Sequence, residues 1–288
     1  MRKQFYFILI AVCLAVLFGY RMWDNQRTDT DVPQIHTAGP IPEISVAEPR
    51  SALLQGLTAT DKTAGDVTNS LVVERIQLLS SDGQLMVSYA AFDNAGNVAK
   101  FQREARYTDY TRPRFSLNGP LLYSNRGSFD VLDTVTARDV IDGDIQHRIR
   151  ATSLDAHSIS QLGVHDVQFQ VTNSLGDTVT YVFPVETYDP TLYDGELALT
   201  DYLVYLTADE SFTPGSYLRS FTFRGEQTSL SRGLPSGYKL ETKGAVDTRT
   251  PGVYPVEFRV TYTIKHETDP SKDQHYTAYS KLIVIVEG

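Results

Sequence analysis

The sequence predicts an all-β fold in which tandem β-sandwiches follow an N-terminal transmembrane helix. The first observation is an internal repeat: the phrase Leu57–Val67 returns as Val135–Ile145 with the same Thr-Ala-x-Asp opening and the same Gly-Asp close. Repeats of this kind indicate stacked copies of one structural unit. The second is an alternation of apolar and polar residues in several segments, which is typical of half-buried strands. The third is an unbroken apolar run at the N-terminus, after which no helix-length amphipathic segment stands out.

The bulk composition fits several folded domains. The chain has 288 residues, of which 41% are hydrophobic and 21% are charged, so a packed core is expected. A formal net charge of -9 gives no general attraction for phosphate backbones, which excludes nucleic acid as an expected partner. Cys13 is the 1 cysteine, so no disulfide forms within the chain.

Residues 1–23 are predicted to be a transmembrane signal-anchor. Aromatic residues flank the apolar run as they flank membrane-spanning helices; they are Phe5, Phe7, Tyr20 and Trp23. Arg2 and Lys3 favour an inside N-terminus, which places the body of the protein on the extracytoplasmic side. A cleaved signal peptide is the alternative, although Leu17–Tyr20 is a poor cleavage site.

Residues 24–40 are polar and contain Pro33, Gly39 and Pro40, which predicts a flexible stalk. The first domain is expected over 41–108. Residues 85–91 alternate, Asp93–Asn97 has turn composition, and residues 98–106 would return as the partner strand of a hairpin.

The second and third domains are expected over 113–187 and 196–288. In the second, Val167, Phe169 and Val171 share one strand face, and Asn173–Asp177 is the turn. In the third, residues 256–264 alternate clearly, but the Asp-Gly-Asp phrase is missing and extra sequence over 212–243 partly replaces it. Short linkers with Pro favour a stiff rod of three domains in series, on the order of 100 Å long at about 3.3 Å per strand residue.

The repeated phrases resemble a bacterial immunoglobulin-like domain that occurs in repeats on surface proteins and in one class of insecticidal crystal toxin, related to the hyalin repeat. That family combines a Thr-Ala-x-Asp…Asp-Gly-Asp-Ile phrase, a Gly-x-Tyr-x-Val strand and an Asp-x-x-Gly-Asn hairpin. The matching segments are Thr58–Asp61, Gly65–Thr68 and Asp93–Asn97 in the first domain, Thr136–Asp139, Asp142–Ile145, Gly163 and Asn173–Gly176 in the second, and Gly252–Val256 in the third. The resemblance implies immunoglobulin-like sandwiches in a surface or adhesive context, without catalytic activity.

Asp139, Asp142 and Asp144 are candidate calcium ligands, because hard cations prefer clustered carboxylates. The alternative is that these side chains cap the turn by accepting backbone N–H bonds. The 6 histidines are scattered, and the sequence lacks the motifs of nucleophilic, phosphoryl-transfer and dinucleotide chemistry. We therefore expect a protein that is not an enzyme.

Tyrosines of the third domain are candidates for a partner face; they are Tyr217, Tyr238, Tyr276 and Tyr279. Exposed rings can stack on sugars, whereas buried ones are ordinary core residues. The sequence thus predicts a membrane-anchored bacterial surface protein that serves as a stalk, adhesion module or interaction scaffold for an extracellular protein or glycan. Binding of carbohydrate or peptidoglycan, and a role as accessory subunit of an envelope enzyme or secretion complex, are the alternatives.

Overall fold

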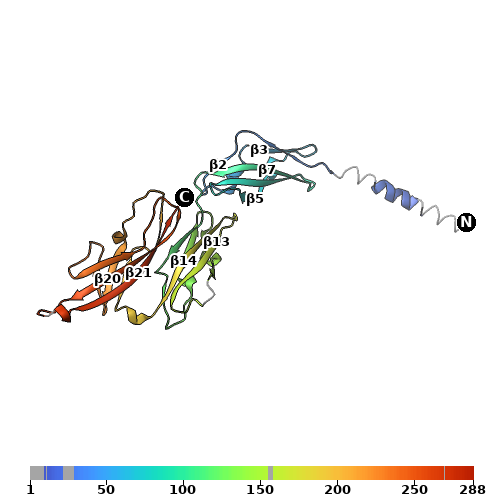
Figure 1. Ribbon diagram of the computed structural model, residues 1–288. Helices are drawn as coiled ribbons and strands as arrows, with labels where there is room; N and C mark the ends of the chain where they lie inside the picture. The colour runs from blue at the N-terminus through green and yellow to red at the C-terminus, as the bar shows by residue number, and fades with distance from the viewer. Residues whose placement is uncertain (1–9, 11, 22–28, 155–157, 269) are drawn as a thin grey trace. The chain divides into compact units, whose positions relative to one another are not determined.

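The computed structural model describes residues 10, 12–21, 29–154, 158–268 and 270–288. The chain divides into two compact units, Met1–Tyr110 and Thr111–Gly288 (Figure 1). The first unit contains one β-sandwich, domain 1, and the second contains two, domains 2 and 3.

Domain 1 consists of a three-stranded and a four-stranded sheet. The first sheet has the order β1 (Gln34–Thr37), β3 (Leu57–Asp61), β4 (Gly65–Asp66). The second has the order β2 (Glu43–Ile44), β7 (Val98–Tyr107), β6 (Gln84–Phe92), β5 (Val72–Leu78). All pairs are antiparallel except β2 with β7, which is parallel.

Domains 2 and 3 repeat this plan strand for strand. The three-stranded sheets are β8 (Arg114–Leu117), β10 (Val135–Asp139), β11 (Gly143–Asp144) and β15 (Gly195–Leu199), β17 (Leu218–Phe223), β18 (Glu226–Ser229). The four-stranded sheets are β9 (Leu122–Ser124), β14 (Thr178–Tyr188), β13 (Gly163–Thr172), β12 (Arg150–Ser153) and β16 (Leu203–Leu206), β21 (Gln274–Val286), β20 (Gly252–Ile264), β19 (Tyr238–Lys243). The second strand again pairs in parallel with the last, as β9 with β14 and β16 with β21.

The predicted all-β fold of tandem sandwiches is confirmed, and the alternation that predicted it is visible in the cores. On β13, Val167, Phe169 and Val171 are buried, whereas Gln168 and Gln170 are only partly buried. Side chains of successive strand residues point to opposite faces of a sheet, so one face of each strand fills the sandwich. The predicted hairpins of the first two domains are β6 with β7 and β13 with β14.

The repeated Gly-Asp phrase has a backbone reason. Gly65 and Gly143 have φ of 76° and 72° and begin β4 and β11 directly after the turn. Glycine adopts this left-handed conformation without steric cost. The repeat therefore preserves a turn.

The predicted stalk over 24–40 is wrong in its second half. Residues 34–37 form β1, which pairs with β3 along Gln34↔Thr60 to Thr37↔Leu57. Domain 1 thus begins before residue 41. The pattern of β1 is weak because it is a short edge strand whose side chains are exposed except for half-buried Ile35.

Domains 2 and 3 do not follow one another as separate beads. Residues 278–286 of β21 are buried on both strand faces. Leu282 and Val284 belong to the core of domain 3, whereas Ile283 and Ile285 pack into the core of domain 2. The two sandwiches are therefore joined side by side along β21 into one unit (Figure 1).

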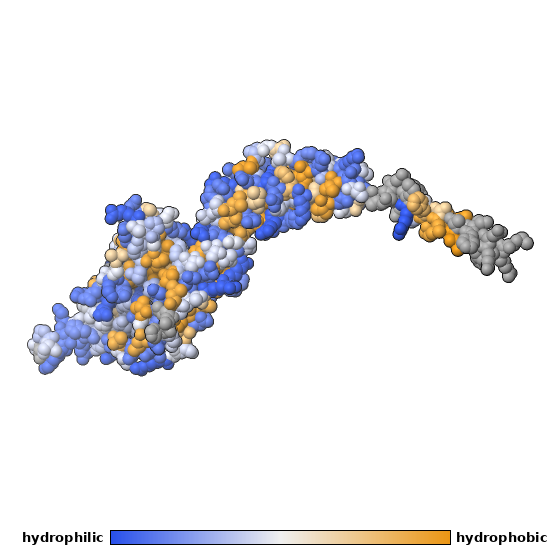
Figure 2. Space-filling model, turned by 45° about the vertical axis from the view of Figure 1, so that its right-hand side comes forward, coloured by the Kyte–Doolittle hydropathy of each residue, from blue (hydrophilic) through white to orange (hydrophobic). Residues whose placement is uncertain are grey.

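Residues 12–21 are α-helical. Within the described part of the chain, no helix is both long and apolar enough to cross a membrane. Phe5, Phe7 and Trp23 lie outside the described residues, and Tyr20 is on the helix and exposed. Apolar side chains on this helix and at residue 10 are more than half exposed; they are Ile10, Val12, Leu14, Val16, Leu17 and Phe18 (Figure 2).

Candidate functional site

Three carboxylates meet at one end of domain 1. Asp61 is the last residue of β3, Asp93 directly follows β6, and Asp29 precedes β1. One carboxylate oxygen of each residue lies within 4.8 Å of the other two. Asp61 and Asp93 are 6% and 9% exposed, so two negative charges are largely withdrawn from water at this point.

Hydrogen bonds hold Asp93 in its place. Its Oδ1 accepts from the backbone N–H groups of Ala95 and Asn97, each at 2.8 Å, and its Oδ2 accepts from Asn97 Nδ2 at 2.7 Å. Burial acts to raise the pKa of Asp93, but the bonds from Asn97 and Ala95 outweigh it and hold the pKa below its usual value. The ionised form of Asp93 is therefore the one that the turn stabilises.

The Asp61 carboxylate is only half satisfied. Its Oδ1 accepts from the backbone N–H groups of Thr63 at 2.8 Å and Ala64 at 2.6 Å. Its Oδ2 is buried and has no hydrogen-bond partner among the described residues. A buried carboxylate oxygen without a donor is costly.

Asp29 is fixed by contacts on its own segment and on the turn after β6. Its Oδ1 accepts from the backbone N–H of Asp31 at 3.0 Å, and its carbonyl oxygen accepts from Asn97 Nδ2 at 3.0 Å. Asn97 thereby bonds both Asp93 and the backbone of Asp29.

The equivalent end of domain 2 has the same strands but a different pair of side chains, Asp139 with Asn173. Asp139 ends β10 as Asp61 ends β3, and Asn173 follows β13 as Asp93 follows β6. Asp139 Oδ1 again accepts from two backbone N–H groups, but Asp139 Oδ2 accepts from Asn173 Nδ2 at 3.1 Å. Domain 1 has Asp93 at the position equivalent to Asn173, so it lacks the amide donor. Asp61 Oδ2 is therefore left without a partner.

A positively charged side chain, that of Arg112, lies at the same end of domain 2. Asp177, which occupies the turn position of Asn97, bonds Arg112 Nη2 at 2.7 Å. Arg112 comes from the segment before β8, as Asp29 comes from the segment before β1. In domain 2 an arginine thus approaches the turn from the place where domain 1 has a third carboxylate.

In domain 3 the residues at the two corresponding strand ends are Phe223, the last residue of β17, and Lys265, which directly follows β20. A two-residue turn, Arg224-Gly225, joins β17 to β18. Phe223 packs against Tyr276 with ring centroids 4.0 Å apart, and the Arg224 guanidinium lies over both rings. This explains why the Asp-Gly-Asp phrase is missing from domain 3.

The structure does not bring the predicted calcium ligands to one point. Asp139 Oδ1 caps its own turn, Asp142 Oδ2 bonds Arg148 Nη1 and the Ser174 N–H at 2.6 Å each, and Asp144 Oδ1 accepts from the Gln146 N–H at 2.9 Å. A search of the described residues finds one group able to converge on a metal ion, Asp29 with Asp61 and Asp93. Asp61 and Asp93 belong to the repeated phrases, and the sequence could have pointed to them because Asp93 stands where the second copy has Asn173. Asp29 lies outside the repeated phrases, so no sequence pattern pointed to it.

The four predicted partner-face tyrosines do not form one surface. Tyr217 stacks on Phe212, and Tyr238 stacks on Tyr262, with its hydroxyl bonded to Thr228. Tyr276 packs on Phe223 as described above. Tyr279 is buried against domain 2: it stacks on Tyr193 at 5.2 Å and donates a hydrogen bond to Glu186. The rings of Tyr217, Tyr238 and Tyr276 pack against the core of domain 3. The ring of Tyr279 packs in the junction between domains 2 and 3.

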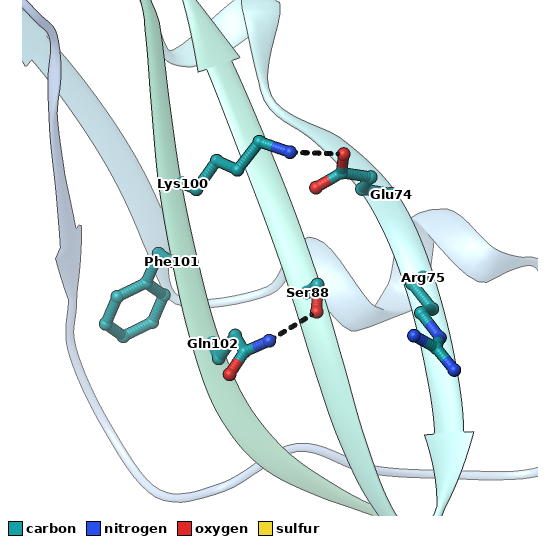
Figure 3. A pocket seen from close by; sticks show the side chains of 6 residues that line it. All are labelled: Glu74, Arg75, Ser88, Lys100, Phe101 and Gln102. Atoms are coloured by element: carbon teal, nitrogen blue, oxygen red, sulfur yellow. Dashed lines mark hydrogen bonds and ion pairs between the residues drawn. The ribbon is translucent and has the colours of Figure 1, made fainter.

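A concavity lies on the outer face of the β5–β6–β7 sheet of domain 1 (Figure 3). Lys100 Nζ bonds Glu74 at 2.7 Å, and Gln102 Nε2 bonds Ser88 at 2.9 Å. Phe101 points away from these polar groups (Figure 3). The concavity therefore offers hydrogen-bonding groups without an aromatic platform.

No family model matches the chain. An uncharacterized 81.3 kDa protein of Acholeplasma phage L2 is 30% identical over 122 residues, which are 42% of this chain and 15% of that protein. The chain thus spans about 15% of the length of the curated relative that it matches.

Solved structures resemble the chain at low scores. The M60 catalytic domain with the CBM51-1 and CBM51-2 domains of Clostridium perfringens ZmpB has a TM-score of 0.24 and 10% identity and covers 82% of this chain and 37% of that one. The extracellular cadherin domains 1–5 of protocadherin gamma B2 have a TM-score of 0.20 and 9% identity, and the match covers 90% of this chain and 61% of that one. The strand order of the chain itself defines its class: a tandem β-sandwich protein in which one seven-strand plan occurs three times.

Proposed function

We propose that the chain is a non-enzymatic, extracytoplasmic scaffold or adhesion protein that is anchored to a bacterial membrane by its N-terminal segment and presents its sandwiches to a protein partner. The observation that carries this proposal is the junction of domains 2 and 3. A strand buried on both faces, with an ion pair inside the junction, makes the two sandwiches one body. Such a body suits a protein that holds a surface in place.

The anchor is supported by the exposed apolar side chains of Ile10 and of residues 12–20. Large exposed apolar patches are typical of contact with a membrane or another protein. The apolar run and its flanking Arg2 and Lys3 favour the membrane and an outward-facing body.

Glycan binding is a second candidate because of the concavity in Figure 3. Lys100, Gln102 and Ser88 supply the donors and acceptors that hydroxyl-rich ligands need. Against it stands the orientation of Phe101, since sugar sites commonly include a ring that stacks on the ligand.

Cell fractionation tests the anchor. The tagged full chain should stay in the membrane pellet after alkaline carbonate extraction, and external protease should remove its sandwiches from intact cells. A variant with Leu14→Lys and Leu17→Lys should move to the soluble fraction, whereas Lys62→Gln, a surface control, should not. Recovery of the unaltered chain in the carbonate supernatant contradicts the anchor.

Crosslinking in intact cells followed by affinity purification tests the partner. A crosslinked protein captured by the full chain supports the scaffold, and its co-purification in stoichiometric amounts from membranes identifies an envelope complex. Retention on a glycan array that is lost in Gln102→Ala favours the second candidate instead.

A further inference from the structure

We propose that Asp29, Asp61 and Asp93 of domain 1 bind a calcium ion. The starting point is the convergence of their carboxylate oxygens within 4.8 Å. Negative groups this close repel one another unless a cation or a proton lies between them.

The buried Asp61 Oδ2, which has no partner, indicates where a ligand is needed. In domain 2 the equivalent oxygen of Asp139 faces the Asn173 amide. In domain 1 the same direction leads to Asp93, whose Oδ2 already accepts from Asn97 and has no hydrogen to give. A cation at this point would satisfy Asp61 Oδ2 as the Asn173 amide satisfies Asp139 Oδ2.

The comparison of the two domains makes the charge balance explicit. Domain 2 combines Asp139 with a neutral amide and brings a guanidinium to Asp177. Domain 1 combines Asp61 with a second carboxylate and brings a third carboxylate from the segment before β1. The neighbouring Lys62 pairs instead with Asp31, at 3.5 Å, and its side chain is 84% exposed. The end of domain 1 thus has an acidic excess that the same fold avoids in domain 2.

Oxygen-only ligands of this kind suit calcium. Calcium takes about 6–8 oxygen ligands from carboxylates, carbonyls and water in flexible geometry, whereas magnesium demands a near-ideal octahedron and keeps its waters. Asp29 is only partly buried, so water can complete the coordination from its side. The bound ion would tie the segment before β1 to the ends of β3 and β6.

Titration calorimetry on the chelator-treated full chain in mild detergent tests the site with calcium chloride. One ion should bind per chain with a Kd of about 0.1–1 mM, the range of extracellular calcium modules. At ten times Kd the melting temperature of domain 1 should rise by about 6–11 °C. Magnesium at the same concentration should give a smaller shift.

The variant Asp93→Asn decides between calcium and a shared proton. It restores the Asp-to-Asn pair of domain 2, so it should fold, weaken calcium binding at least about 10-fold, and melt higher than the calcium-free parent. Asp66→Asn is the matched control: Asp66 caps the Thr68 N–H outside the cluster at 2.9 Å, so its calcium affinity should match the parent. Absence of binding by the parent at 10 mM calcium, or equal binding by both variants, overturns the proposal.

Amide hydrogen exchange measures whether calcium orders the segment before β1. The Asp31 amide, which donates to Asp29 Oδ1, should exchange more slowly with calcium than without it in the parent and in Asp66→Asn. In Asp93→Asn calcium should leave its exchange unchanged. A calcium effect on this amide that persists in Asp93→Asn contradicts the assignment.

Discussion

Lys281 of β21 and Glu186 of β14 form an ion pair across the junction of domains 2 and 3. The Lys281 side chain is 3% exposed and that of Glu186 is 19% exposed. The Tyr279 hydroxyl also donates to Glu186, at 3.1 Å. Both charges have therefore lost most of their hydration and depend on each other for compensation.

Substitution of Lys281 alone should strongly destabilise the junction. Lys281→Met leaves the Glu186 charge inside the junction without its cation, which should cost about 3–5 kcal/mol of unfolding free energy. The double variant Lys281→Met with Glu186→Gln removes both charges and keeps an acceptor for Tyr279, so it should cost less than Lys281→Met. Urea unfolding of the full chain measures both, and domains 2 and 3 should separate into two transitions in Lys281→Met.

An exposed pair in domain 3 is the control for this prediction. Lys239 and Glu241 lie 2.8 Å apart, but their side chains are 74% and 55% exposed. Lys239→Met should leave the urea midpoint nearly unchanged, because an exposed ion pair contributes little to stability. Equal losses in the two lysine variants would show that the buried pair does not hold the junction.

Tyr205→Phe should weaken the same junction at a second point. The Tyr205 hydroxyl accepts from the backbone N–H of Phe115 at 2.9 Å, and burial raises the pKa of Tyr205 well above its usual value. Phenylalanine leaves that N–H without its acceptor, at a cost of about 1–3 kcal/mol. Tyr276→Phe, whose hydroxyl bonds the exposed Gln274, should change the urea midpoint little; a similar shift in both variants contradicts the prediction.

Asn173→Asp should reproduce in domain 2 the unsatisfied pair of domain 1. The change removes the Nδ2 donor of Asp139 Oδ2 and sets two carboxylates side by side, so about 1–3 kcal/mol of stability should be lost at pH 7. Thermal melting measures the loss. Since an arginine approaches this end of domain 2, calcium should restore little of it, and full recovery at 1 mM calcium would count against the difference that we draw between the two domains.

Asp109 should make domain 1 sensitive to acid. Bonds from the Ser45 hydroxyl and the Val46 N–H lower the pKa of Asp109. A folded-state pKa below the unfolded value of about 3.9 adds stability that is present above that value and is lost as the pH falls through the folded pKa. The difference in unfolding free energy between the parent and Asp109→Asn should therefore shrink between pH 5 and about pH 2.

Urea unfolding at several pH values checks this prediction, with Glu104→Gln as the control. Glu104 is an exposed carboxylate on β7 of the same domain. A pH-independent difference between the parent and Asp109→Asn would show that the bonds to Ser45 and Val46 do not stabilise the charged form.

The sequence alone determined the strands and their repetition. Alternation on β13 and β20 and the glycine turns at Gly65 and Gly143 are local properties, set by which side of a strand is buried and by which residue tolerates a positive φ. The sequence also showed that Asp61 and Asp139 occupy the same place in two copies.

Only the tertiary structure decided what those residues meet. Asp29, Asp61 and Asp93 come together because the sandwich brings the ends of β3 and β6 and the segment before β1 to one pole. The run Leu282–Val286 is apolar at every position, but hydrophobicity alone does not say which surface covers the second face of such a strand. Packing against domain 2 supplied that answer, because a contact between distant segments depends on the whole fold and not on the pattern of either one.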